Sequence, residues 1–131
     1  MMAALTNQLN AFTKMHDEFI VEWNKTMMTG DTSAVERMDE QYFAVFLNGK
    51  PVIFNKEEAV TGMRQSVQQL LGAKKHFQNR VIRLRDYENA VVFYELLIEK
   101  EEQVLARFFT IENWQLINGN WMLIRETEEP I

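Results

Sequence analysis

Residues 110–126 read TIENWQLINGNWMLIRE, and this stretch carries the strongest fold signal of the chain. Asn118-Gly119 is the dipeptide typical of a two-residue β-hairpin turn, and apolar and aromatic residues flank it on both sides. The stretch therefore predicts two antiparallel strands, over residues 104–117 and 120–126. One carboxylate, Glu112, stands in the first of these strands. What surrounds that carboxylate, solvent or a pocket, bears directly on function.

Strand-like patterns continue upstream of this hairpin. Residues 75–87 and 90–100 are also strand-like, and short polar connections separate each strand from the next. Residues 41–47 (QYFAVFL) and 51–54 (PVIF) predict a further hairpin with an Asn-Gly turn between them. We therefore expect a largely antiparallel sheet.

The remaining segments have helical patterns. A 3.6-residue apolar period predicts a long amphipathic helix that ends near Gly30. Ser33 and Glu36 have the spacing of a capping box and predict a short second helix, and Asn55 and Glu58 predict a third helix in the same way. Helices first and antiparallel strands later are typical of an α+β fold with the helices on one face of a bent sheet. No linker or repeat divides residues 1–131, so we expect a single domain.

Composition narrows the class of protein. The net charge is −5, so a nucleic-acid partner is not expected, because phosphate binding depends mainly on Lys and Arg. The chain has no cysteine, which removes disulfides, thiol catalysis and thiolate metal sites. Its apolar runs are shorter than the ~20 residues of a membrane span, and its N-terminus lacks the features of a secretory signal. We therefore expect a cytoplasmic protein without a membrane partner.

The order of these segments resembles the nuclear-transport-factor-2-like superfamily. The resemblance rests on a long helix ending in Gly30-Asp31, a hairpin, a capped helix, and a meander that closes with Asn118-Gly119-x-Trp121. Residues 111–121 (IENWQLINGNW) are particularly similar to the association domain of calcium/calmodulin-dependent kinase and to related small bacterial proteins. The resemblance implies a cone: a curved antiparallel sheet of mixed strand order, wrapped around three N-terminal helices, with a pocket between the first helix and the concave face. It does not imply a reaction, since this fold serves SnoaL-like cyclases, ketosteroid isomerases, carriers and oligomerisation modules.

Strand register predicts which side chains share the concave face. If a three-residue loop at 101–103 closes the two central strands, Val92 lies opposite Glu112, and the pairs Tyr94–Thr110 and Leu96–Phe108 follow. The predicted pocket is therefore lined by one helix residue and seven sheet residues: Trp23, Val92, Tyr94, Leu96, Phe108, Thr110, Glu112 and Trp114.

The opposite, convex face predicts a partner. Residues 90–98 (AVVFYELLI) are apolar on both faces, unlike a strand with one face in water. The helices cover one face, and a second copy of the sheet is the economical cover for the other. We expect a homodimer through the convex face, with a monomer of partly apolar outer surface as the alternative. That face carries apolar residues and a charged rim: Val91, Phe93, Leu97, Phe109 and Ile111, with Glu95, Glu99 and Arg107.

Glu112 is the candidate catalytic residue. A carboxylate on an apolar face either has a raised pKa or finds a cation or hydrogen-bond donor. The candidate partners are Tyr94, His76 and an arginine of residues 75–87, a strand whose register the pattern does not determine. The sequence leaves two interpretations open: a general acid or base or a polar anchor for a ligand, or a structural carboxylate that is satisfied by its partner or lies near the rim.

The other candidate residues do not match the catalytic groups of steroid isomerases or a metal site. The resemblance places Trp23 where steroid isomerases have an oxyanion-stabilising tyrosine, but an indole cannot shuttle a proton. It places the isomerase's catalytic aspartate at or beside Leu47, next to Asn48, where no carboxylate is available. His16 lies beside the apolar stripe of the first helix, and neither it nor His76 has a partner at metal-ligand spacing. We expect no metal or cofactor, and a solvated end at residues 126–129.

Three functions remain. The first is binding of a small organic ligand in a mostly apolar pocket. The second is an enzyme of SnoaL or isomerase type that uses Glu112 as acid or base on a hydrophobic carbonyl compound. The third is an oligomerisation module whose pocket is vestigial. The sequence does not identify the ligand.

Overall fold

The computed structural model describes residues 2–46 and 51–131. Over these residues the chain forms two α-helices, a short 3₁₀ helix and six strands, in this order: α1 (Met2–Thr29), η1 (Ser33–Val35), β1 (Met38–Phe46), β2 (Val52–Asn55), α2 (Lys56–Gln69), β3 (Lys74–Asp86), β4 (Asn89–Lys100), β5 (Gln103–Ile117) and β6 (Asn120–Pro130). Neither α-helix is long and apolar enough, over these described residues, to cross a membrane.

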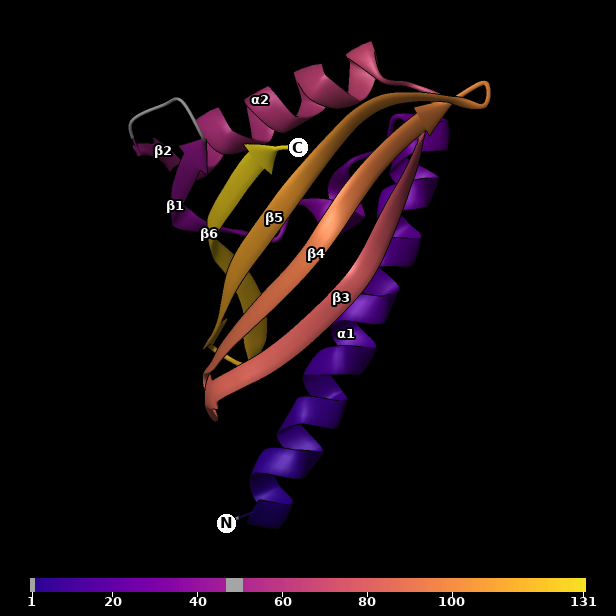
Figure 1. The fold of residues 1–131 in the computed structure, drawn as a ribbon. Helices are drawn as coiled ribbons and strands as arrows, with labels where there is room; N and C mark the ends of the chain where they lie inside the picture. The colour runs from indigo at the N-terminus through magenta and orange to yellow at the C-terminus, as the bar shows by residue number, and fades with distance from the viewer. Residues whose placement is uncertain (1, 47–50) are drawn as a thin grey trace.

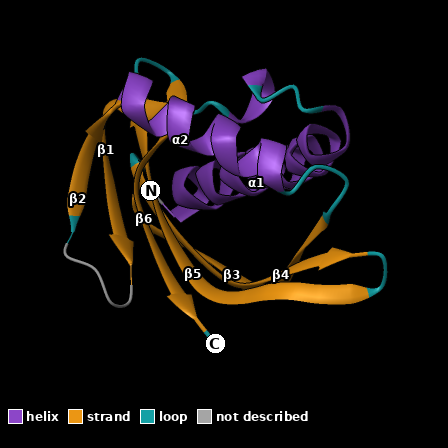
Figure 2. Cartoon of the chain, turned by 90° about the horizontal axis from the view of Figure 1, so that it is seen from above, coloured by secondary structure: helices purple, strands orange, loops and turns teal. Residues whose placement is uncertain are grey.

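The strands form one curved sheet with the order β2-β1-β6-β5-β4-β3. All neighbours are antiparallel except β1 and β6, which run parallel. The sheet bends around α1, and α2 lies near one end (Figures 1 and 2). The α+β prediction is confirmed, but the sheet wraps two α-helices and one 3₁₀ turn instead of three helices.

The long helix ends where the sequence predicts. Phe12, Phe19 and Met27 recur at helical spacing and are buried in the core. Gly30 has φ +82°, and its N–H donates to the carbonyl of Thr26 at 2.8 Å, which terminates α1 with a residue in the left-handed conformation.

The two predicted capping boxes differ in outcome. At α2 the box forms, because Asn55 Oδ1 accepts from the Glu58 N–H at 2.8 Å and Glu58 Oε1 accepts from the Asn55 N–H at 3.0 Å. At Ser33 it does not, because Asp31 accepts from both the Ser33 N–H and its hydroxyl. Glu36 instead accepts from Arg64 of α2, so only one 3₁₀ turn forms there.

The central register is confirmed. Val92 pairs with Glu112, Tyr94 with Thr110, and Leu96 with Phe108. The side chains of β4 alternate between buried and half-buried along the strand, as expected for one face on the core and one outside. A continuous core therefore lies between the concave face and the helices.

The two ends of the sheet differ from expectation. β6 continues to Pro130, and Glu126 and Glu128 pair with β1, so residues 126–129 are strand and not a solvated end. In β3, Lys75 pairs with Ile98 and joins the concave face, whereas Lys74 pairs with Glu99 on the convex side. The turn predicted at Asn48-Gly49 and the isomerase aspartate position beside Leu47 lie outside the described residues.

Candidate functional site

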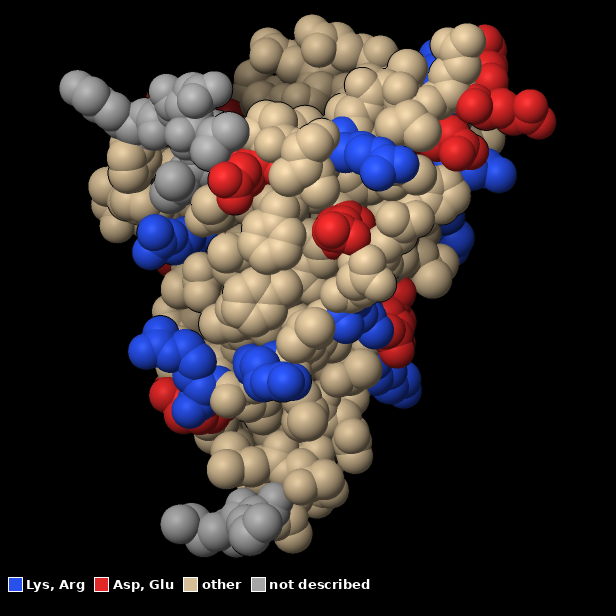
Figure 3. Space-filling model, in the orientation of Figure 1, with Lys and Arg blue, Asp and Glu red and all other residues tan. Residues whose placement is uncertain are grey.

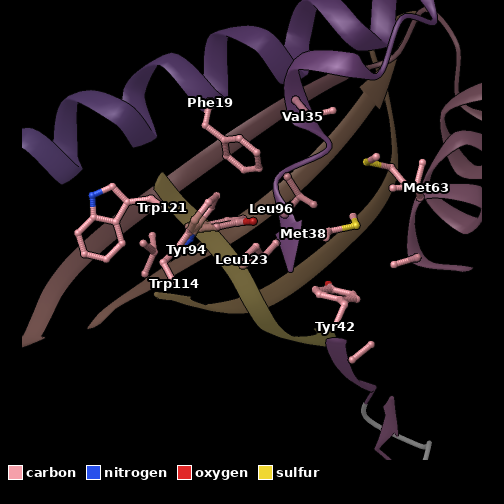
Figure 4. Close-up of a cluster of buried hydrophobic side chains, with 14 of the residues drawn as sticks. Phe19, Val35, Met38, Tyr42, Met63, Tyr94, Leu96, Trp114, Trp121 and Leu123 are labelled. Carbon is pink, nitrogen blue, oxygen red and sulfur yellow. The ribbon is translucent and has the colours of Figure 1, made fainter. Parts of the chain in front are cut away.

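A cavity of about 480 Å³ lies between α2 and the ends of the strands. Most of its wall is apolar, and Met38, Tyr42 and Met63 belong to it (Figure 4). Four wall residues are solvent-exposed and mark the mouth: Glu58, Gly62, Ser66 and Leu105. The other members of the wall are Trp23, Ala44, Phe54, Ala59, Leu70, Lys75, Leu96, Ile98, Ala106, Phe108, Glu126 and Glu128.

Polar groups gather on one part of this wall. Glu126 and Glu128 alternate along β6 and therefore point to the same face of the sheet. The hydroxyl of Tyr42 donates to Glu126 Oε2 at 3.0 Å. Nζ of Lys75 lies 3.5 Å from the centroid of the Trp23 ring. Apart from Glu58 at the mouth, the cavity thus combines an apolar wall with one amine and two carboxyl groups.

Burial shifts the proton affinities of this cluster. The pKa of Glu126 is raised well above its usual value by burial, and Glu128 and Glu112 add repulsion. Burial lowers the pKa of Lys75, although the same carboxylates oppose the shift. Among the described ion pairs within 4.0 Å, none joins Lys75 to a carboxylate. The cluster therefore contains a carboxyl group that is protonated more readily than in water and an amine that loses its proton more readily than in water.

Glu112 lies in a second, more deeply buried cluster. Its side chain is 2% exposed, and three donors bind it. His16 Nε2 is 2.8 Å and Trp114 Nε1 2.9 Å from Oε1, and the hydroxyl of Tyr94 is 2.6 Å from Oε2. Burial alone would raise the pKa of Glu112, but these hydrogen bonds and the electrostatic attraction of His16 outweigh it and hold the pKa below the usual value. Glu112 is thus an ionised carboxylate whose oxygens already have donors.

The hydrogen-bond roles of the His16 ring follow from its other neighbour. Arg80 NH1 lies 3.0 Å from His16 Nδ1, and a guanidinium can only donate. Nδ1 therefore accepts from Arg80, and Nε2 donates to Glu112. Arg80 also binds Asp17, whose side chain is more than half exposed. A hydrogen-bonded series thus runs from the surface, through the His16 ring, to the buried carboxylate.

A small cavity of about 40 Å³ lies between the two clusters. Tyr94 and Glu112 line it together with Lys75, Glu126 and Glu128. Its volume is enough for a water molecule, and its wall offers several polar partners. Glu112 and the cluster of Lys75, Glu126 and Glu128 therefore both border this small cavity, which we call the polar chamber.

The predicted pocket residues fall into three groups. Trp23, Leu96 and Phe108 line the large cavity. Tyr94 and Glu112 line the small one, together with Trp23 and Leu96. The remaining three are buried but line neither cavity: Val92, Thr110 and Trp114.

Two predicted partners of Glu112 are wrong. His76 pairs with Leu97 in the register of β3, so its side chain lies on the convex side, 3.9 Å from Glu99. The arginine of β3 reaches Glu112 only through His16. Tyr94 is the predicted partner that does bind it.

Sequence reasoning missed the residues that dominate the site. His16 is fully buried, and it lies four residues after Phe12 and three before Phe19, so the helical period already placed it on the apolar face. Glu126 and Glu128 alternate with Thr127, which is a strand signal overlooked in an acidic tail. For Lys75 no comparable signal exists, because Lys74 beside it is the same residue type.

Comparison with known proteins identifies the fold. No family model and no curated protein matches the chain. A protein of unknown function with a cystatin-like fold from Nostoc punctiforme has a TM-score of 0.68 at 20% identity, covering 91% of this chain and 90% of its own. A nuclear-transport-factor-2-like protein of unknown function from Pseudomonas putida has a TM-score of 0.76 at 9% identity, covering 95% and 87%. A protein from Parabacteroides distasonis named as a candidate ketosteroid isomerase has 0.65 at 13% identity, covering 92% and 85%.

The chain therefore has the nuclear-transport-factor-2-like fold, as the sequence predicts. The identities are too low to transfer a function with the fold.

Proposed function

We propose that this protein binds a small organic molecule in the large cavity, with its apolar part against the α2 wall and its polar part against Lys75, Glu126 and Glu128. The observation that carries the proposal is an apolar cavity of about 480 Å³ whose inner wall bears two carboxyl groups and an amine that forms no ion pair with any described carboxylate. Ligand pockets in proteins are roughly 300–1,000 Å³ and combine apolar walls with a few polar groups in this way. Buried polar groups cost free energy unless a partner satisfies them, and a bound ligand supplies that partner.

The glycine at the mouth gives a clean test. A Cβ added at Gly62 meets no atom within 4 Å, so Gly62→Phe should fold and place a ring over the opening. The control is Thr61→Phe, since Thr61 is exposed on the same helix but does not line the cavity. With 1-anilinonaphthalene-8-sulfonate as the fluorescent probe, we expect Gly62→Phe to weaken binding about tenfold, a change of about 1.4 kcal/mol. Equal probe affinity in both variants would contradict the proposal and would support an oligomerisation module with a vestigial pocket.

An enzyme of SnoaL or isomerase type is the second candidate. Its support is the raised pKa of Glu126, a carboxyl group open to the large cavity. Glu112 stays a proposed acid or base as well, but its oxygens already have three donors, so Glu126 is the better placed of the two. The test is exchange of the α-protons of 2-tetralone in D₂O, followed by NMR. Exchange that Glu126→Gln abolishes supports the enzyme, and exchange no faster than in buffer contradicts it.

We also propose that the convex face pairs with a second copy of the chain. Phe109 is 36% exposed there, and the outward side chains of β4 are only partly buried by their own chain. Figure 3 shows that uncharged side chains cover much of this face, with basic and acidic groups scattered among them. Such a surface is typical of an interface between copies.

A further inference from the structure

We infer that Lys75 is a reactive lysine whose amine condenses with the carbonyl group of an apolar aldehyde or ketone held in the large cavity. This inference rests on the proposed ligand site and assigns it a chemistry. It differs from the second candidate function, because the covalent step belongs to a lysine and not to a carboxylate.

The backbone of Lys75 is held in place from both sides. Asn24 of α1 accepts from the Lys75 N–H at 3.1 Å and donates to its carbonyl at 3.2 Å. On the other side, Lys75 pairs with Ile98 of β4, so its side chain enters the concave face. That side chain lines both cavities, beside the ring of Trp23. The amine therefore stands at the junction where a ligand in the large cavity meets the polar chamber.

The surroundings of this amine favour its uncharged form. An amine attacks a carbonyl carbon only as the free base, and desolvation is the usual way in which proteins produce it. Burial lowers the pKa of Lys75, and no described carboxylate lies within 4.0 Å to hold the ammonium as an ion pair. The Trp23 ring and the carboxylates farther away favour the ammonium, but the net shift is downward.

A proton donor for the second half of the reaction lies in the same wall. Glu126 lines both cavities with Lys75, and its raised pKa keeps its carboxyl group protonated more readily than in water. Tyr42 holds this carboxyl group through its hydroxyl. The reacting atoms of the ligand would therefore lie between the amine and an acid.

The reaction balances with these two groups. Nζ attacks the carbonyl carbon, and the oxygen takes up a proton from the nitrogen to give a carbinolamine. The carboxyl group of Glu126 then donates a proton to the hydroxyl, which leaves as water while a C=N bond forms. The carboxylate of Glu126 regains a proton from the resulting iminium nitrogen. The net change is amine and carbonyl to imine and water, with no oxidant or reductant.

The test uses the full chain and a matched pair of lysines. Protein is incubated with 6-methoxy-2-naphthaldehyde and sodium cyanoborohydride, and the reduced adduct is located by peptide mass spectrometry. Lys74 is the internal control, because it neighbours Lys75 but lies exposed on the convex side. Burial lowers the pKa of Lys75 and so increases its share of free amine near neutral pH, and we therefore expect labelling of Lys75 to exceed that of Lys74 although Lys74 is the more exposed. Labelling in proportion to exposure would overturn the inference, even without any variant.

Substitutions at Lys75, Lys74 and Glu126 test which residue forms the adduct. Lys75→Arg should lose the adduct while Lys74→Arg retains it, and Glu126→Gln should slow adduct formation without preventing it. An adduct yield in Lys75→Arg equal to that of the natural sequence contradicts the inference.

A non-covalent arm separates this inference from the proposed function. 6-Methoxy-2-naphthalenemethanol has the same ring system but no carbonyl group, and its binding is followed by fluorescence in the Gly62→Phe and Thr61→Phe variants. If the alcohol binds and Gly62→Phe weakens it, but the aldehyde does not label Lys75, the ligand site stands and the reactive lysine is wrong. If the alcohol does not bind and Lys75 is not labelled, both fail.

Discussion

At the scale of single residues, the buried carboxylate of Glu112 is held by donors that its own fold supplies. Trp114 lies two residues along the same strand, and Tyr94 is a diagonal neighbour across the β4–β5 pair. An ionised group in a core is tolerated only when its hydrogen bonds are made. Each of these donors should therefore contribute measurably to stability.

Tyr94→Phe tests one donor while keeping the ring. The variant removes the 2.6 Å hydrogen bond to Glu112 Oε2, and a bond to a buried charged group is worth about 2 kcal/mol, so we expect the free energy of unfolding to fall by that amount. Urea denaturation at pH 7 measures it. The control is Tyr87→Phe, since Tyr87 is 53% exposed and should change stability little. Equal stabilities of the two variants would show that the bond contributes nothing.

Glu112 and Glu126 should respond to pH in opposite ways. The folded pKa of Glu112 is lowered, so its stabilisation is present above the unfolded pKa of about 4.3 and is lost as the pH falls through the folded value. The folded pKa of Glu126 is raised, so folding is favoured below about 4.3 and loses stability as the pH rises through the folded value.

Glu126→Gln removes the second effect. Its amide oxygen can still accept from Tyr42, but it cannot ionise. We expect the variant to gain stability over the natural sequence as the pH rises above about 4.3, by about 1.4 kcal/mol for each unit by which the folded pKa is raised. Urea midpoints from pH 4 to pH 8 measure the difference, with the exposed Glu129→Gln as control. A difference that stays constant with pH argues against a raised pKa.

At the scale of elements, one sequence pattern led to two structures. Both capping-box patterns have a polar residue followed three positions later by Glu, yet only Asn55–Glu58 forms the reciprocal bonds. Near Ser33 the competing partners are Asp31, two residues earlier, and Arg64, on a different helix. The first competitor could be read from the sequence, but the second depends on tertiary packing.

Two alanine variants measure that difference. Asn55→Ala removes a formed cap and should cost about 1 kcal/mol of unfolding free energy. Ser33→Ala removes only an exposed hydroxyl bonded to Asp31 and should cost much less. Thermal denaturation of both variants, monitored by circular dichroism, gives the comparison. A larger loss for Ser33→Ala would mean that the 3₁₀ turn anchors the chain more strongly than α2 does.

Strand register was predictable where the pattern is strict and unpredictable where it breaks. The β4–β5 pairs follow from a period of two and a short loop, and every predicted pair forms. β3 contains an irregularity between Gln78 and Val81, with Asn79 at φ 56°, which no alternation reveals. Lys75 lies before Asn79 and Arg80 lies after it, so only the structure shows which way these two side chains point.

At the scale of the whole molecule, the position of the large cavity depends on contacts between distant segments. Its wall combines residues of α1, α2 and all six strands of the sheet. The parallel pairing of β1 with β6 brings the acidic end of the chain to Tyr42, and no local pattern encodes that pairing. The sequence could therefore predict the concave face and the buried Glu112, but not the cluster at Lys75, Glu126 and Glu128.

The dimer belongs to this scale as well, and one residue on each side of the molecule tests it. Phe109 lies between Glu95 and Glu129, its register partners on the convex face, so Phe109→Glu adds a third carboxylate there, and a dimer formed through this face should dissociate at micromolar concentration. Val21→Glu is the control, because Val21 is an exposed apolar residue of α1, 56% accessible, away from that face. Light scattering should give twice the 15.5 kDa chain mass for the natural sequence and for Val21→Glu, and the single mass for Phe109→Glu. Because the large cavity lies on the opposite side of the sheet, dissociation should leave probe binding intact. Simultaneous loss of both would mean that the second copy shapes the cavity.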